Sequence, residues 1–217
     1  MMSSSRPRPP REIRLTNSLT GKKEPVVTLE PGKLSFYSCG PTVYGLVHIG
    51  NLRAGLVSDL AFRAFQKAGY AVTFVRNYTD VDDKIIARAR EEGITPEALA
   101  NKYTLEVEKD FAVAGMQEPT HKTTVTTHMP EIITMISRII ANGKAYVVDG
   151  DVYFSVDAFP TYGRLSKKPK DDLIAGARVE VDARKRSPVD FALWKEAKPG
   201  EPFWESPWGR GRPGWHI

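Results

Sequence analysis

Apolar residues follow alternating strand-like and helix-like spacings from residue 26 onward. The stretch VVTLEPGKLSFYSC (26–39) contains two short strand-like runs separated by a Pro-Gly turn. From Asn51 to Lys67 the spacing predicts a helix, and Gly69 supplies its stop signal. Residues 71–77 form a nearly continuous apolar run rich in β-branched side chains, as expected of a buried parallel strand. The apolar residues that recur every four positions in the predicted helix are Leu52, Leu56, Leu60 and Ala64.

Two further helices are predicted in close succession. Asp82 and Asp83 open the first, because acidic side chains favour a helix N-terminus, and Gly93 ends it. In the sequence TPEA, Thr95 is the expected N-cap and Pro96 the first residue of the second helix. One face of that second helix is lined by apolar residues four positions apart, namely Leu99, Tyr103, Val107 and Phe111.

The character of the chain changes after the fourth predicted helix, which starts at Pro130 and ends at the Asn-Gly pair 142–143. Two apolar runs around Asp149-Gly150 predict a β-hairpin. Residues 157–190 are rich in loop-forming residues and dense in charge, as expected of an insertion on a nucleotide-binding core. The basic residues of this segment include Arg164, Lys167, Lys168, Lys170, Arg178, Arg184, Lys185 and Arg186.

The alternation of strands and helices before residue 144 is typical of βαβ units in an open parallel sheet. We therefore expect an α/β fold with a Rossmann-like parallel sheet.

The composition is that of an ordinary globular protein, with 41% hydrophobic and 26% charged residues among 217. No apolar run is long enough to predict a membrane span, and residues 1–11 read as a disordered leader rather than a secretory signal. A single cysteine excludes an internal disulfide framework and favours a reducing, cytoplasmic location. The formal net charge of +5 only slightly favours anionic partners.

The stretch SCGPTVYGLVHIGNLR places a loop between a strand end and a helix that begins near His48. Backbone N–H groups at a helix N-terminus suit a bound phosphate, and Gly50 lets the backbone approach a ligand. His48 and Asn51 add hydrogen-bond donors that can stabilise charge on a transferring group. Alternatively, His48 only caps the helix and Gly50 only permits tight packing. Cys39, as a lone cysteine at a strand end, is also typical of a small buried apolar residue.

Five blocks resemble the cysteinyl-tRNA synthetase family of class I aminoacyl-tRNA synthetases, in order and with the family's spacing from about residue 12 onward. The blocks are SCGPTVYGLVHIGNLR, YTDVDDKII, YGRLS, AGARVEVDARKRSPVDFALWK and WGRGRPGWHI. In this resemblance HIGN is the family's form of the class I HIGH motif.

The resemblance implies that Cys39 is a ligand of one Zn²⁺ that binds the substrate thiolate. Zinc prefers thiolates and can keep an open position, so a metal–sulfur bond would distinguish cysteine from serine where pocket shape discriminates poorly. The resemblance also implies a site for ATP with Mg²⁺, with His48 and Asn51 as catalytic residues. The implied ATP-binding residues are Pro41, Thr42, Tyr44, Gly45, His48, Gly50 and Asn51. The implied cysteine-binding residues are Gly40, Thr42, Thr79 and Trp215.

Two groups of charged residues have alternative interpretations. Asp80, Asp82 and Asp83 are possible Mg²⁺ ligands, although acids at a helix start are also expected from capping. The basic residues of 164–186 could face the tRNA acceptor end, or they could be solvated or paired with nearby acids. The candidate internal pairs join Arg178, Arg184 and Arg186 to Glu180 and Asp182.

The resemblance implies four segments: the leader at 1–11, the first half of the catalytic domain at 12–143, a connective-peptide insertion at 144–190, and the start of the second half at 191–217. The family continues past GWHI, so we expect a truncated chain that lacks the other zinc ligands, the KMSKS loop and the anticodon-binding domain. One cysteine cannot bind zinc tightly, so we expect the isolated chain to have little activity.

The expected parent activity is cysteine--tRNA ligation by a monomer, with ATP, L-cysteine and the cysteine tRNA as substrates. Two alternatives stay open: a cysteine ligase of the mycothiol pathway, which acts on an amino-sugar, and a non-catalytic nucleotide- or RNA-binding remnant.

Overall fold

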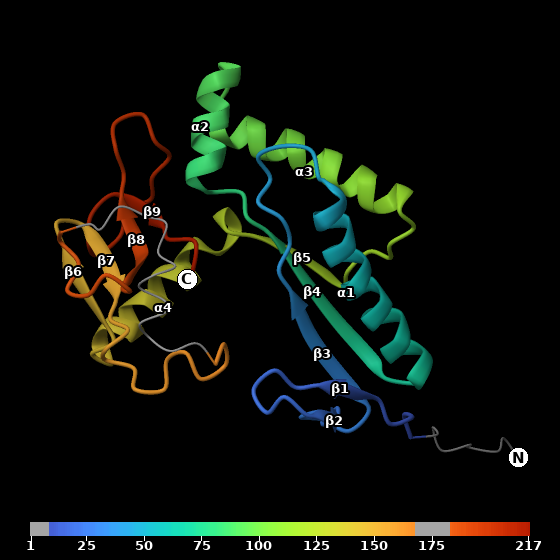
Figure 1. Ribbon diagram of the computed structural model, residues 1–217. Helices are drawn as coiled ribbons and strands as arrows, with labels where there is room; N and C mark the ends of the chain where they lie inside the picture. Colours follow the sequence, from blue (N-terminus) through green and yellow to red (C-terminus); the bar gives the residue numbers. More distant parts are fainter. Residues whose placement is uncertain (1–8, 168–182) are drawn as a thin grey trace, which may run out of the picture. The chain divides into compact units, whose positions relative to one another are not determined.

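The structure is a computed structural model that describes residues 9–167 and 183–217, and these form two compact units (Figure 1). Unit 1 comprises Met1–Asp80 and Glu97–Val125, and unit 2 comprises Val81–Pro96 and Thr126–Ile217. Each unit is built around a sheet of its own.

Unit 1 contains a parallel sheet in the order β3-β4-β5, formed by Lys33–Ser38, Ala71–Tyr78 and His121–Thr124. The parallel α/β architecture and the strand expected at 71–77 are confirmed. The pattern of apolar residues did not predict β5. Its sequence HKTT is polar, and it joins the sheet through backbone pairing with β4.

Helix α1 (Ile49–Ala68) connects β3 to β4 and ends at Gly69, whose φ of 99° is in the left-handed region. It packs on the sheet through an aromatic cluster in which the rings of Phe36 and Phe74 stack with centroids 4.4 Å apart. Two of the recurring leucines of this helix are exposed, Leu56 by 42% and Leu60 by 68%. The buried face carries Gly55, Asp59, Phe62 and Phe65.

Helix α3 (Pro96–Val113) begins at the predicted proline, and all four residues of its predicted apolar face are buried. Its C-terminal connection is tied to α1 by Asp59. One oxygen of this buried carboxylate accepts a hydrogen bond from Gln117 N at 2.8 Å, and the other accepts one from Arg63 Nε at 2.7 Å.

A small antiparallel pair precedes the main sheet of unit 1, formed by β1 (Arg14–Thr16) and β2 (Lys23–Pro25). The first of the two predicted strand-like runs, VVTLE at 26–30, is not a strand, because β2 ends at Pro25 and the apolar side chains of Val27 and Leu29 point into solvent. Val27, for example, is 88% exposed.

Unit 2 contains α2 (Asp83–Glu92), η1 (Thr126–His128) and α4 (Met129–Ala141). The predicted ends of α2 are confirmed: the Asp82 side chain caps it by accepting from Lys84 N at 2.9 Å, and Gly93 ends it. The fourth helix is also confirmed, with Ile136 fully buried.

The sheet of unit 2 is antiparallel in the order β6-β7-β8-β9. Its first two strands, Ala145–Val148 and Asp151–Phe154, form the predicted hairpin around Asp149, whose φ is 47°. The other two are Phe191–Glu196 and Gly211–Pro213. The sheet therefore combines strands from both sides of the boundary expected at residue 191, and that domain boundary stays a prediction.

No helix in the described part of the chain has both the length and the apolar character needed to cross a membrane.

Candidate functional site

Just after the carboxyl end of β3, Gly40 passes close against β4. Gly40 N donates to Asn77 Oδ1 at 2.9 Å, and a Cβ on residue 40 would lie 1.7 Å from the Asn77 carbonyl oxygen. Only glycine fits there. Immediately afterwards Thr42 pairs with Thr79, and Thr79 N donates to Pro41 O at 3.2 Å. The structure thus brings together the residues predicted around the cysteine substrate that belong to unit 1.

His48 is the N-cap of α1 and forms a capping box with Asn51. His48 Nδ1 accepts from Gly50 N at 3.1 Å, and Asn51 Oδ1 accepts from His48 N at 3.1 Å. Because Nδ1 is the acceptor, the neutral imidazole carries its proton on Nε2. The two interpretations of His48, as a helix cap and as a donor to a ligand, are therefore compatible. The cap uses Nδ1 and leaves an Nε2–H donor beside the helix N-terminus.

The start of α1 suits an anion. Its first turn carries no acidic residue, so the positive end of the helix dipole is not neutralised by the helix's own side chains. Gly50 is required by the cap itself, since a Cβ there would lie 2.9 Å from His48 Cε1. Gly45 is under no such steric constraint, because a Cβ there would meet no atom within 4 Å. Tyr44, in the same loop, is 41% exposed.

A cavity of about 110 Å³ lies within unit 1 between the β3–α1 loop and the first turns of α1. It brings together four predicted residues, Cys39, Gly40, Pro41 and Asn51. It also contains Arg76, which the sequence analysis did not identify as functional. The available signal was a charged residue within the apolar run AVTFVRN. The remaining lining residues are Ser38, Ala54, Gly55 and Phe111.

Cys39 is exposed, so its interpretation as a buried apolar residue is wrong. Partial burial raises the pKa of Tyr37, and the charge of the Cys39 side chain and a hydrogen bond with it raise that pKa further. Among residues 9–167 and 183–217, the structure has no group of three or more His, Cys, Asp or Glu side chains that could hold a metal ion. Because zinc needs at least three protein ligands, the described residues do not form a zinc site around Cys39.

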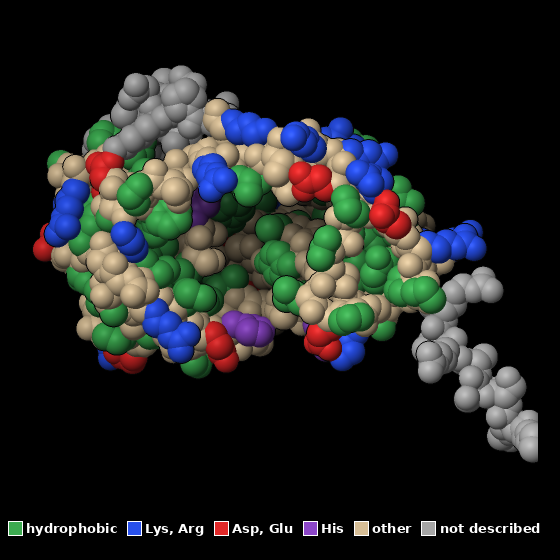
Figure 2. Space-filling view, turned by 90° about the horizontal axis from the view of Figure 1, so that it is seen from below, with side chains coloured by type: hydrophobic (Ala, Val, Ile, Leu, Met, Phe, Trp, Pro, Cys, Tyr) green, Lys and Arg blue, Asp and Glu red, His purple; other side chains and the backbone are tan. Residues whose placement is uncertain are grey.

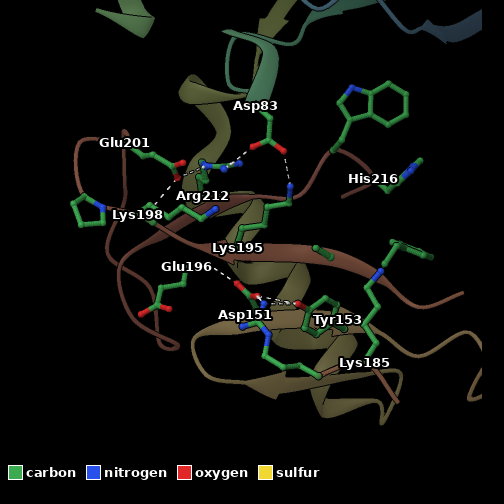
Figure 3. Close-up of a pocket in the computed structure, with 16 residues that line it drawn as sticks. Asp83, Asp151, Tyr153, Lys185, Lys195, Glu196, Lys198, Glu201, Arg212 and His216 are labelled. Carbon is green, nitrogen blue, oxygen red and sulfur yellow. Dashed lines mark hydrogen bonds and ion pairs between the residues drawn. The ribbon is translucent and has the colours of Figure 1, made fainter. Parts of the chain in front are cut away.

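Trp215, the remaining predicted cysteine-binding residue, belongs to unit 2 and is 64% exposed. With His216 it lines a pocket of about 840 Å³ (Figure 3). Within this pocket Asp83 lies between Lys195 Nζ at 2.7 Å and Arg212 Nη2 at 2.6 Å.

Burial alone would raise the pKa of Asp83, but the hydrogen bond from Lys195 and the charge of Arg212 outweigh burial and lower it. The carboxylates proposed for Mg²⁺ thus have other partners in the structure. Asp82 caps α2, Asp83 is ion-paired, and Asp80 Oδ1 accepts from Val125 N at 2.8 Å.

Two of the basic residues near the hairpin contact other side chains of unit 2. Arg184 pairs with Asp151 at 2.7 Å, and the guanidinium of Arg186 lies 4.2 Å from the ring centroid of Tyr146. Lys185 makes no ion pair with a described residue and lies 5.9 Å from the ring centroid of Tyr153. Basic side chains are spread among acidic and apolar ones on the face shown in Figure 2. Five residues of the predicted basic segment and its acidic partners lie outside the described residues, namely Lys168, Lys170, Arg178, Glu180 and Asp182.

Comparison with known proteins identifies the family of this chain. The family model described as tRNA synthetases class I (C) catalytic domain matches residues 25–217. A cysteine--tRNA ligase from Trichlorobacter lovleyi is 55% identical over 205 residues, covering 94% of this chain and 42% of that protein. One from Desulforudis audaxviator is 56% identical, covering 94% of this chain and 43% of the relative. The chain thus spans less than half the length of these relatives.

Among solved structures, one similar chain comes from the ternary complex of Agrobacterium radiobacter K84 agnB2 LeuRS-tRNA-LeuAMS. It is 19% identical, with a TM-score of 0.48, and the match covers 58% of this chain and 16% of that chain.

Proposed function

The chain belongs to the class I (C) tRNA synthetase family, and on that premise we propose that it forms part of the catalytic site of a cysteine--tRNA ligase. The observation that carries this proposal is the capping box of His48 and Asn51 beside the Cys39–Pro41 loop. It places donors at a helix N-terminus, next to the residues proposed to bind the amino acid.

Two steps make up the proposed reaction. First, the cysteine carboxylate attacks the α-phosphate of ATP, forming cysteinyl-adenylate as pyrophosphate leaves. Second, a ribose hydroxyl of the terminal tRNA adenosine attacks the adenylate carbonyl, and AMP leaves. His48 Nε2–H and the amides at the start of α1 stabilise negative charge on the phosphate in the first step. Mg²⁺ enters with the triphosphate.

The proposed site residues are those expected from the sequence, each in a defined role. Gly40, Thr42 and Thr79, all in unit 1, surround the amino acid. Trp215, which belongs to unit 2, is the fourth residue proposed to bind cysteine. The nucleotide is bound by Pro41, Thr42, Tyr44, Gly45, His48, Gly50 and Asn51. Cys39 is exposed beside this site and would contribute one thiolate to Zn²⁺, with the other ligands supplied from outside the described residues.

The cysteine tRNA is the proposed macromolecular partner. Lys185 and Lys198 line the unit 2 pocket and make no ion pair with a described residue, so their charges are available for phosphate contacts. A cytoplasmic location and a monomeric state stay predictions of the sequence.

A chimaera tests the proposal, in which this chain replaces the matched part of the Trichlorobacter lovleyi ligase. We expect cysteine-dependent exchange of pyrophosphate into ATP and charging of the cysteine tRNA. His48→Asn retains a capping side chain but lacks the Nε2–H donor, and should reduce kcat about 100-fold. Cys39→Ser should reduce the preference for cysteine over serine.

Three results would contradict the proposal. Amide formation on an amino-sugar without tRNA charging would support the mycothiol-type ligase. A folded chimaera that binds ATP or RNA without exchange would support a non-catalytic remnant. Equal kcat in the chimaera and its His48→Asn variant would show that His48 does not stabilise the phosphate in the first step.

A further inference from the structure

Arg76 is the most unusual charged residue in unit 1. It lies on β4, is only 3% exposed, and its Nη2 has no hydrogen-bond partner among the described residues. A guanidinium cannot shed its charge at physiological pH, unlike a buried lysine or carboxylic acid. A buried positive charge with an unmet donor is therefore a strong indication that an anion binds there.

Two aromatic rings lie close to the guanidinium of Arg76. Arg76 Cζ lies 5.0 Å from the ring centroid of Phe74 and 4.9 Å from that of Phe111. Such cation–π contacts favour a buried guanidinium but do not satisfy N–H groups in its plane. Glu108 lines a second small cavity with Arg76, but its carboxylate pairs with Lys122 at 2.8 Å. No ion pair joins Arg76 to any residue of the described ranges.

Arg76 lines two small cavities, and the larger of them also contains Cys39, Gly40, Pro41 and Asn51. Its volume of about 110 Å³ suits a single carboxylate or phosphate group. It is well below the roughly 300 Å³ or more of pockets that enclose a whole drug-sized ligand. The same cavity reaches the first turns of α1, so two sources of positive potential meet there.

We propose that Arg76 binds an oxyanion of the substrate, a carboxylate or phosphate group, between the Cys39–Pro41 loop and the start of α1. If the function proposed above holds, the sources are the cysteine carboxylate and the α-phosphate of ATP. That function identifies the source, whereas binding of an anion at Arg76 depends only on the geometry of unit 1.

The first experiment uses the 217-residue chain alone. Its thermal midpoint is measured in sodium acetate, sodium phosphate and sodium chloride at equal ionic strength. We expect acetate or phosphate to raise the midpoint relative to chloride, because a ligand that binds only the folded state stabilises it. Arg76→Met keeps an unbranched apolar side chain between the two rings and should weaken anion binding about 30-fold or more.

Two further variants sharpen this result. Arg90→Met removes an exposed arginine and should respond to the anions like the wild type. Arg76→Lys keeps the charge but loses the paired donors, so it should retain weakened binding. If Arg76→Met does not fold, the Nε–Hε NMR signal of Arg76 in the wild-type chain decides: it should shift saturably with acetate or phosphate but not with chloride.

Equal anion responses in the wild type and Arg76→Met, or no response of the wild type at either readout, would overturn the assignment. In the ligase chimaera, a carboxylate at Arg76 predicts that Arg76→Met raises KM for cysteine, and a phosphate predicts that it raises KM for ATP. If the chimaera catalyses no exchange while anion binding still requires Arg76, the proposed function fails and this inference stands.

Discussion

The cavity of unit 1 and the pocket of unit 2 differ in how their charged groups are satisfied. The pocket is larger, about 840 Å³ against about 110 Å³, but many of its charges are already paired. Asp83, Arg212 and Asp151 all take part in ion pairs there. The small cavity is instead lined by Arg76, a buried arginine with an unmet donor. The smaller cavity, and not the larger pocket, is therefore lined by a buried charge that makes no ion pair with a described residue.

The two units can also be compared in how closely their backbone segments approach one another. In unit 1 the loop passes so close to β4 that a side chain at residue 40 is excluded, which is a constraint expected where a backbone must approach a ligand. Unit 2 has the same constraint at Gly214, where a Cβ would lie 1.9 Å from the Ala192 carbonyl oxygen, and it also contains buried side-chain hydrogen bonds. Asp190 is 2% exposed and accepts from Tyr146 Oη at 2.8 Å and from Val156 N at 2.9 Å.

The largest expected effect comes from Gly40→Ala. The added Cβ would lie 1.7 Å from Asn77 O, so the strand end must move, and we expect the free energy of unfolding to fall by about 3 kcal/mol. Gly45→Ala is the matched control and should change it by less than about 0.5 kcal/mol. Urea unfolding followed by far-UV circular dichroism compares the two. Equal stability of the two variants would show that the loop relaxes without cost.

An intermediate effect is expected in unit 2 from Asp190→Asn. The amide NH₂ replaces an oxygen that accepts hydrogen bonds, which leaves buried donors facing one another and should cost about 2 kcal/mol. Asp149→Asn makes the same substitution at an exposed turn residue with φ of 47°, a conformation that asparagine tolerates. Tryptophan fluorescence during urea unfolding reports on both, because Trp194 is buried in this unit. If Asp190→Asn left the free energy of unfolding unchanged, water would have to replace the lost acceptor.

The smallest effect is a pH dependence at Asp83. Its folded pKa is lowered below the ordinary value of 3.8, so the unfolded chain takes up the proton first as pH falls. The stabilisation is fully present above about pH 5 and is lost progressively below pH 3.8. The side chain is 59% exposed, so solvent screening should keep the effect below about 1 kcal/mol. Asp83→Asn should flatten the dependence of the urea midpoint on pH between 5 and 3, and an unchanged slope would contradict this.

Sequence patterns predicted an element well where local spacing and burial agreed. Helix α3 is the clear case, since its four apolar positions all lie in the core. Helix α1 was predicted as a helix, but its buried face was not, because Phe62 and Phe65 are interleaved with leucines that remain exposed. Strand β5 could not be predicted, since its polar residues are recruited by pairing with β4.

The candidate site was only partly predictable for a similar reason. The HIGN turn is contiguous in sequence, so its loop and helix start could be recognised together. Arg76 is on another strand, and no sequence pattern indicates whether a buried charge has a partner. The ion pairs of Asp83 with Lys195 and Arg212 also join residues far apart in the chain, and they were likewise missed.

The capping box at the start of α1 makes the orientation of the His48 imidazole depend on the fraying of one helical turn. When that turn opens, the imidazole of His48 regains both tautomers and the nearby amide donors turn to water. The population of molecules with an aligned Nε2–H therefore follows a local opening equilibrium, which can weaken with heat well before unit 1 melts as a whole.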